Sequence, residues 1–171
     1  MFAGTTLCTR ALAAWEAVRQ VSQLLEALQS YCAANGEGSE VPIIVCGDFN
    51  DEPNSQSCHL MRMNTPFRFL SIWDFKVETT EESSPVTTFK WRPAGLNKRI
   101  IDYVWYPLPH LPSKKFDPAM IIRFTSSGGL ELVRRWAMLS DSQIGEQGLP
   151  TDGYGSDHIA LCAQFNWNDK E

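Results

Sequence analysis

The sequence lacks the long apolar runs that are typical of membrane proteins. No stretch reaches the roughly 20 apolar residues that a transmembrane helix needs. The N-terminus has no basic region followed by a long apolar segment, so we expect no secretory signal. Internal repeats and low-complexity tracts are also missing. These absences favour a soluble intracellular protein without a membrane partner.

The cysteine pattern of a disulfide scaffold or a zinc site is missing as well. The five cysteines are odd in number and widely spaced, and no C-x-x-C motif occurs. This usage predicts free thiols in a reducing compartment. We therefore expect a cytoplasmic protein, although the sequence does not exclude an organelle.

The chain has no excess of basic residues. Its 15 lysines and arginines against 20 acidic residues give a net charge of −5. This charge excludes nucleic-acid binders that rely on a broad basic face, so any recognition of phosphate must be local. The length of 171 residues predicts a single domain.

Apolar periodicity predicts a mixed α/β organisation. A helical stripe covers 13–34 and is formed by Trp15, Val18, Leu24, Leu25, Leu28 and Tyr31. Short runs rich in β-branched or aromatic residues predict strands at 43–46, 87–91, 99–107, 118–124 and 159–165. Residues 92–98 are expected to form a turn, and 130–139 fits either a helix or a strand. We expect the aromatic residues Phe89, Trp91, Trp105 and Tyr106 to lie in the core.

Three short polar groups lie beside these strands. They are Gly47-Asp48-Phe49-Asn50, Ile101-Asp102-Tyr103 and Ser156-Asp157-His158. Together they offer carboxylates, a carboxamide and an imidazole on rigid strand ends. Cleavage of a phosphate ester needs an activated water, neutralisation of the charge at the phosphorus and an oriented attack. These side chains could supply all three functions.

Each group has a simpler interpretation when it is taken alone. Asp48 and Asn50 are typical turn residues, because both side chains bond to nearby backbone. His158 alone would suit an ordinary loop. Asp102 is harder to explain in this way, because a carboxylate in a buried strand is costly without a partner. The combination of all the groups favours a catalytic origin.

The three groups, in this order, resemble the endonuclease/exonuclease/phosphatase superfamily, and within it the deadenylase-like branch. The resemblance covers about 15–166 and rests on "WEAVRQVSQLLEALQ", "VPIIVCGDFNDEP", "TTFKWRPAG", "IIDYVWY" and "QIGEQGLPTDGYGSDH". It implies a two-sheet α/β sandwich, of which 1–171 would form a single partial domain. It also implies a phosphoesterase that depends on Mg²⁺, with Mn²⁺ as an alternative.

The resemblance implies a role for each site residue. Asp48 would act as the general base or polarise the attacking water, and would help to hold the metal. Asn50 would support the transition state and bind substrate. Asp102 would orient His158, which would stabilise the phosphoryl group. Asp157 would hold the metal. Arg10 falls on a position that is basic in the family, and this makes it a candidate substrate contact.

One family feature is missing from the sequence. The family has an N-terminal strand that ends in a metal-binding glutamate, and none of the glutamates here occupies such a position. We therefore expect the chain to begin about halfway through the domain, with the N-terminal portion missing or supplied by a complementing chain. The implied substrates are the 2′-phosphate of NADP(H), another nucleotide, or the 3′ end of poly(A) RNA. The alternative is a catalytically inactive binding or interaction module.

Overall fold

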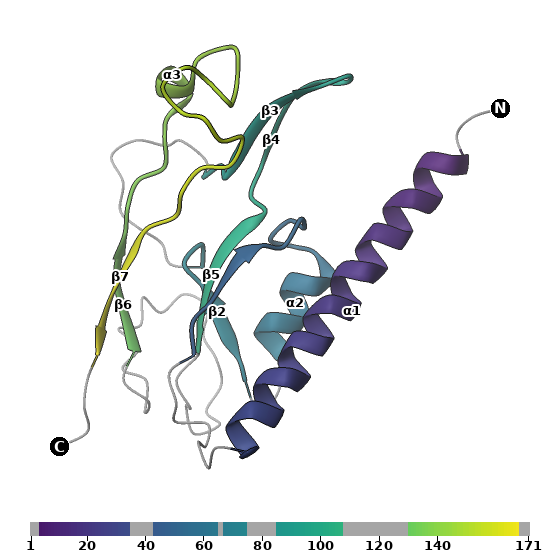
Figure 1. Ribbon diagram of the computed structural model, residues 1–171, viewed down its shortest axis with the longest axis vertical. Coiled ribbons are helices and arrows are strands. Elements are labelled where there is room, and N and C mark those ends of the chain that lie inside the picture. Colours follow the sequence, from purple (N-terminus) through teal and green to yellow (C-terminus); the bar gives the residue numbers. More distant parts are fainter. Residues whose placement is uncertain (1–3, 35–42, 65–66, 75–84, 108–129, 168–171) are drawn as a thin grey trace.

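The mixed α/β prediction is confirmed by the computed structural model (Figure 1), which describes residues 4–34, 43–64, 67–74, 85–107 and 130–167, and within these ranges the side chains of residues 12–166. None of the helices within these ranges is long and apolar enough to cross a membrane. The elements in chain order are α1 (Gly4–Ala34), β1 (Val45–Asp48), α2 (Gln56–Met63), β2 (Phe69–Ser71), β3 (Thr88–Arg92), β4 (Gly95–Arg99), β5 (Asp102–Pro107), β6 (Leu130–Arg135), α3 (Asp141–Ile144) and β7 (Ala163–Trp167).

The centre of the fold is an antiparallel three-stranded sheet with the order β1-β5-β2. Its central strand β5 is apolar on both faces, and its side chains alternate between two clusters. Tyr103 and Trp105 pack with α1 and α2. Val104 and Tyr106 pack toward β6 and β7. The sheet therefore lies between a helical layer and a β-ribbon, as Figure 1 shows.

The long helix α1 packs through one stripe of side chains. Val21, Leu25 and Cys32 are buried and Leu28 is partly buried, and their spacing of four, three and four residues puts them on one face. The helix begins earlier than predicted, at Gly4 instead of residue 13. Trp15 belonged to the predicted stripe, but its side chain is 65% exposed, because the core lies against the face that carries Val21 and Leu25.

Strands β3 and β4 form a hairpin that projects from the sheet (Figure 1). The prediction of a turn over 92–98 is wrong for its second half, because Gly95–Arg99 pairs with β3 in full register. Gly95 has φ +112°, a conformation that side-chain-bearing residues rarely adopt, and this allows the tight reversal. Phe89 is buried with α3, as predicted, but Trp91 is exposed.

The ribbon of β6 and β7 covers the other face of the central sheet. Residues 130–135 form a strand, which settles the helix-or-strand alternative for the first part of 130–139. Leu132 and Phe165 pack against Ile72 and Tyr106. The last strand begins at Ala163, later than the predicted residue 159. The strand expected over 118–124 lies outside the described residues.

The buried contact between α2 and the sheet gives a direct test of this core. Met61 is fully buried whereas Met63, on the same helix, is 55% exposed. Met61→Ala should lower the free energy of unfolding by about 2–5 kcal/mol, because it removes packed atoms and leaves a cavity. Met63→Ala should change it by less than about 0.5 kcal/mol. Urea unfolding, with the slopes compared, measures both values, and equal effects would show that α2 is packed differently.

Candidate active site

Strand register places the first two candidate residues opposite each other. Asp48, the last residue of β1, is paired with Asp102, the first residue of β5. Directly opposite residues of an antiparallel pair point to the same face with closely spaced side chains. Two carboxylates therefore come together at one end of the sheet, as their positions at strand ends led us to expect.

The turn after β1 is held by local hydrogen bonds. Asn50 has φ +52°, and its backbone N–H donates to Asp48 Oδ1 at 2.7 Å. The buried Tyr103 hydroxyl donates to the carbonyl of Asp51 at 2.9 Å. Burial raises the pKa of Tyr103, so its phenol stays protonated and can act as this donor. The sequence "GDFND" thus forms a fixed turn in which only Oδ1 of Asp48 accepts a hydrogen bond from the turn.

His158 joins these residues from the last third of the chain. Its Nδ1 lies 3.0 and 3.1 Å from the two carboxylate oxygens of Asp102. An ionised carboxylate only accepts hydrogen bonds, so Nδ1 carries the proton. The other ring nitrogen, Nε2, lies 3.9 Å from Asp48 Oδ2. The chain therefore brings together Asp102, His158 and Asp48, with side chains that are 15%, 29% and 33% exposed.

Asp157 points to a different partner. Lys90 Nζ donates to its Oδ2 at 2.6 Å. This hydrogen bond, together with the charge of Lys90, holds the pKa of Asp157 below its ordinary value. The carboxylate is therefore ionised and already paired beside the histidine. Its predicted role as a metal ligand stays a prediction.

The three central side chains could hold a cation. Asp48, Asp102 and His158 can each offer one ligand atom, and these atoms lie within 4.8 Å of one another. Two carboxylates suit a hard divalent ion, and an imidazole is tolerated better by Mn²⁺ than by Mg²⁺. The donor set of this site therefore fits a divalent cation.

Several supporting residues were not identified as site residues from the sequence. Thr87 and Thr88 bond to the backbone near Asp102 and Asp157. Trp73 donates its indole N–H to the carbonyl of Asp102 at 2.9 Å. The alternating pattern of "TTFKW" could have indicated two of the residues on this strand, because it places Thr88 and Lys90 on the same face. Arg10 lies in α1, and its side chain is outside the described part of the chain.

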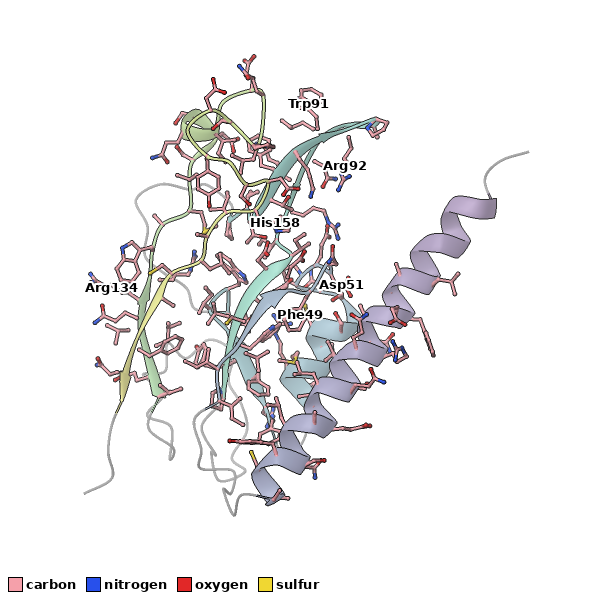
Figure 2. The ribbon with its side chains drawn as sticks, in the orientation of Figure 1. Phe49, Asp51, Trp91, Arg92, Arg134 and His158 are labelled. Atoms are coloured by element: carbon pink, nitrogen blue, oxygen red, sulfur yellow. The ribbon has the colours of Figure 1, made fainter. Side chains whose placement is uncertain are left out.

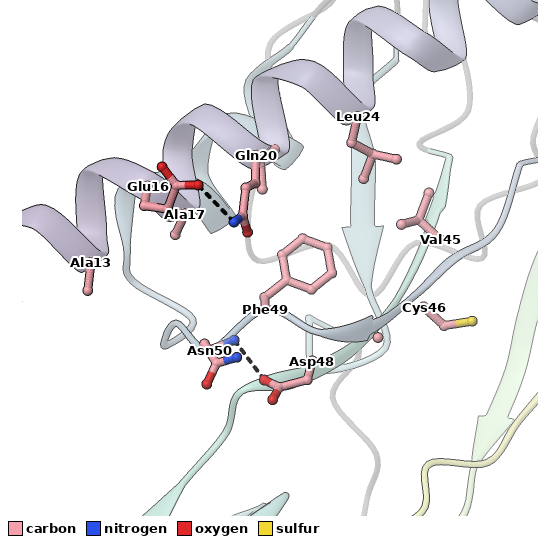
Figure 3. Close-up of a pocket in the computed structure, with 12 residues that line it drawn as sticks. Ala13, Glu16, Ala17, Gln20, Leu24, Val45, Cys46, Asp48, Phe49 and Asn50 are labelled. Atoms are coloured by element: carbon pink, nitrogen blue, oxygen red, sulfur yellow. Dashed lines mark hydrogen bonds between the residues drawn. The ribbon is translucent and has the colours of Figure 1, made fainter.

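The site borders a cavity between α1 and β1. This cavity has a volume of about 500 Å³, and Asp48, Phe49 and Asn50 line it on the β1 side (Figure 3). Glu16 lines the opposite wall, where hydrogen bonds from Arg19 and Gln20 lower its pKa to about 2. Figure 2 shows His158 between the sheet and the base of the β3–β4 hairpin, away from the hairpin tip that carries Trp91 and Arg92.

Comparisons with known proteins agree with this arrangement. The model of the endonuclease/exonuclease/phosphatase family matches residues 27–158. Nocturnin of Xenopus laevis is 30% identical over 167 residues, which cover 94% of this chain and 36% of that relative. Nocturnin of Rattus norvegicus is 29% identical over 168 residues, which cover 94% and 32%. The solved human nocturnin catalytic domain with a bound sulfate anion has a TM-score of 0.52 and 25% identity, covering 87% of this chain and 40% of that chain.

The family match includes all three residues that meet at the sheet end, Asp48, Asp102 and His158. The chain spans about a third of the length of the nocturnins that it matches. The fold, with its antiparallel sheets and flanking helices, is also that of the human catalytic domain. On this evidence the chain belongs to the endonuclease/exonuclease/phosphatase family.

Proposed function

We propose that this chain carries part of the active site of a divalent-metal-dependent phosphoesterase of the nocturnin type. The observation that carries the proposal is the geometry of His158, whose Nδ1 faces Asp102 and whose Nε2 faces Asp48. One carboxylate is placed to orient the imidazole, and the second lies on its reactive side. This arrangement suits the transfer of a phosphoryl group to water.

Each side chain has a defined task in the proposed reaction. Asp102 accepts the hydrogen bond from His158 Nδ1–H, so that Nε2 points at the gap beside Asp48. When protonated, His158 donates from Nε2 to a phosphoryl oxygen in that gap. Asp48 has one oxygen held by the Asn50 backbone, so its other oxygen is available to take a proton from the attacking water. The Asn50 carboxamide would hold substrate without adding charge.

A divalent cation would be held by Asp48, with Asp102 and His158 beside it. Asp157 is the further ligand that the family resemblance implies. When bound, the ion neutralises charge on the phosphoryl oxygens and lowers the pKa of a coordinated water. We propose Mg²⁺ as the physiological ion, with Mn²⁺ as a substitute, because carboxylates dominate the donor set.

The substrate that we propose is a small nucleotide such as NADP(H), cleaved at the 2′-phosphate. The 3′ end of poly(A) RNA is the second candidate. Within the described ranges, three cations of β3 and β4 are paired with acids: Lys90 with Asp157, Lys98 with Asp141, and Arg99 with Glu52. A long polyanion would need several free cations along its path. This pairing therefore favours the small nucleotide, with Arg10 and Asn50 as contacts.

We also propose that a further segment, either an N-terminal half or a complementing chain, docks beside β1. Among the described strands, β1 pairs only with β5, so its other edge is free to accept a strand. Ile44, just before β1, is 46% exposed, and the cavity between β1 and α1 is apolar at Phe49 and Leu24. The same edge supports the second candidate function, an inactive module that binds a partner by strand addition.

The free cysteines Cys32, Cys46, Cys58 and Cys162 support a reducing intracellular compartment. Two of these thiols, on Cys46 and Cys162, are exposed. Exposed thiols persist unpaired where the redox poise is reducing. We propose the cytoplasm as the location.

Activity can be tested directly on the 171-residue chain. We expect Mg²⁺-dependent release of phosphate from NADP(H), or of AMP from oligo(A), and His158→Asn should lower kcat by about 10²–10⁴-fold, because the donor to the phosphoryl oxygen is lost. Asp48→Asn should have a similar effect. His59→Asn is the matched control, because His59 is exposed on α2 outside the group.

Three results would decide between the alternatives. Turnover that survives His158→Asn and Asp48→Asn would remove these residues from the mechanism. No turnover by the chain alone, followed by turnover after addition of an N-terminal half, would show that the enzyme needs the docked segment. No turnover in either case would favour the inactive binding module.

Cation binding can be tested without turnover. Mn²⁺ should broaden the NMR signals of His158 selectively, because the proposed ligands surround its ring. In Asp48→Asn, the Mn²⁺ concentration needed for the same broadening should rise by an order of magnitude or more, since a charged ligand is lost. Asp152→Asn changes an exposed aspartate outside the group and should leave it unchanged. Asp157→Asn decides whether that residue contributes. Equal broadening in all variants would contradict a site at this position.

A further inference from the structure

Two buried threonines connect the segments that carry Asp102 and His158. Thr87 Oγ1 accepts hydrogen bonds from the backbone N–H of Ile101 at 2.9 Å and of Asp102 at 3.1 Å. Thr88 Oγ1 donates to the carbonyl of Asp157 at 3.0 Å. One dipeptide therefore contacts the backbone on both sides of the imidazole–carboxylate pair.

Backbone bonds strengthen this connection. The carbonyl of Thr87 accepts the N–H of Ile159 at 2.8 Å, and Thr88 forms an antiparallel bridge with His158. The N–H of Thr87 donates to the carbonyl of Arg99 at 2.8 Å. His158 is thus held as an additional strand residue beside β3. Its distance from Asp102 is set by the dipeptide, although 56 residues separate the two in sequence.

The hydroxyl of Thr87 fills a specific need at the start of β5. The neighbouring strand β2 ends at Ser71, which is paired with Trp105, so it does not reach Asp102. The two backbone polar groups of Asp102 are instead paired with side chains: its N–H with Thr87 Oγ1 and its carbonyl with the Trp73 indole. Thr87 is fully buried, so no water replaces its hydroxyl.

We propose that Thr87 and Thr88 are positioning residues, which keep the Asp102 carboxylate and the His158 imidazole in bonding geometry during the reaction. The proposal rests on the proposed phosphoesterase function for its kinetic consequence. Its structural part stands on the contacts above. Neither threonine touches the reacting atoms. Thr87 acts through the backbone of Asp102, and Thr88 acts through the backbone of Asp157, which precedes His158.

The test uses the isosteric variant Thr87→Val and the hydroxyl-keeping variant Thr87→Ser. Thr87→Val should lower kcat by about 10-fold to 100-fold and leave KM within about 2-fold of the original chain. The reason is that Asp102, which orients the histidine, shifts, whereas the residues that bind substrate do not. Thr87→Ser should restore kcat to within about 3-fold of the original chain. Thr88→Val and Thr88→Ser repeat the comparison on the histidine side.

Two readouts do not depend on turnover. Amide hydrogen exchange at Asp102 should accelerate in Thr87→Val and return toward the original rate in Thr87→Ser, because only the hydroxyl protects this N–H. The ¹⁵N spectrum of the imidazole at one fixed pH should change from the single Nδ1–H tautomer to a mixture in the valine variants. Substitution of His158 by asparagine assigns its signal among the three histidines.

Met61→Ala separates positioning from general loss of stability. It weakens the core through α2 and touches neither threonine. At a temperature where the Met61→Ala and Thr87→Val variants have the same folded fraction, only Thr87→Val should have a lower kcat than the original chain. Equal losses of kcat, or an unchanged Asp102 exchange rate and tautomer in Thr87→Val, would overturn the proposal. If the original chain shows no turnover either alone or with an added N-terminal half, the proposed function fails, and the exchange and tautomer measurements still decide the positioning role.

Discussion

The pairing register between β1 and β5 is the constraint on which the candidate site depends. It places Asp48 opposite Asp102, so that both carboxylates point to one face at one end of the sheet. A slip of one residue would send one carboxylate to the opposite face. The register is fixed by packing, because Tyr103 and Trp105 are buried against the helices while Tyr106 is buried against the β-ribbon. The core aromatic residues therefore also determine the positions of the acids.

A second constraint brings in the histidine. Register within the central sheet cannot place His158, because this residue belongs to a loop that precedes β7. Its position is set by the start of β3, which pairs with it in an antiparallel bridge and also contacts the beginning of β5. The buried cluster of Phe89, Leu149 and Ile159 holds the same region together. The site is thus assembled from local strand contacts, with hydrophobic packing behind each of them.

The sequence was sufficient to predict the α/β class, most of the strands and the meeting of Asp48, Asp102 and His158. The class and the strands depend on local signals, namely β-branched runs, whereas the meeting of His158 with the two aspartates was implied by the resemblance to the family. The buried face of α1 was predicted correctly at Leu25 and wrongly at Trp15, which has the spacing of a core residue but lies away from the packed face. The pairing of Lys90 with Asp157 was not predicted either, since these residues are 67 positions apart and nothing local relates them.

The exposure of the three site residues indicates on which side a docked segment would cover the site. Asp102 is the least exposed of them, and a carboxylate in that environment needs a partner, which His158 provides. Asp48 is more exposed, and its Oδ2 has only the 3.9 Å contact with His158 Nε2, which suits a residue that must handle water. Catalysis of phosphoryl transfer benefits when bulk water is excluded around such groups. Among the described strands β1 pairs only with β5, and its other edge and the cavity beside it border Asp48, so a segment docked there would cover Asp48 and leave the Asp102–His158 pair undisturbed.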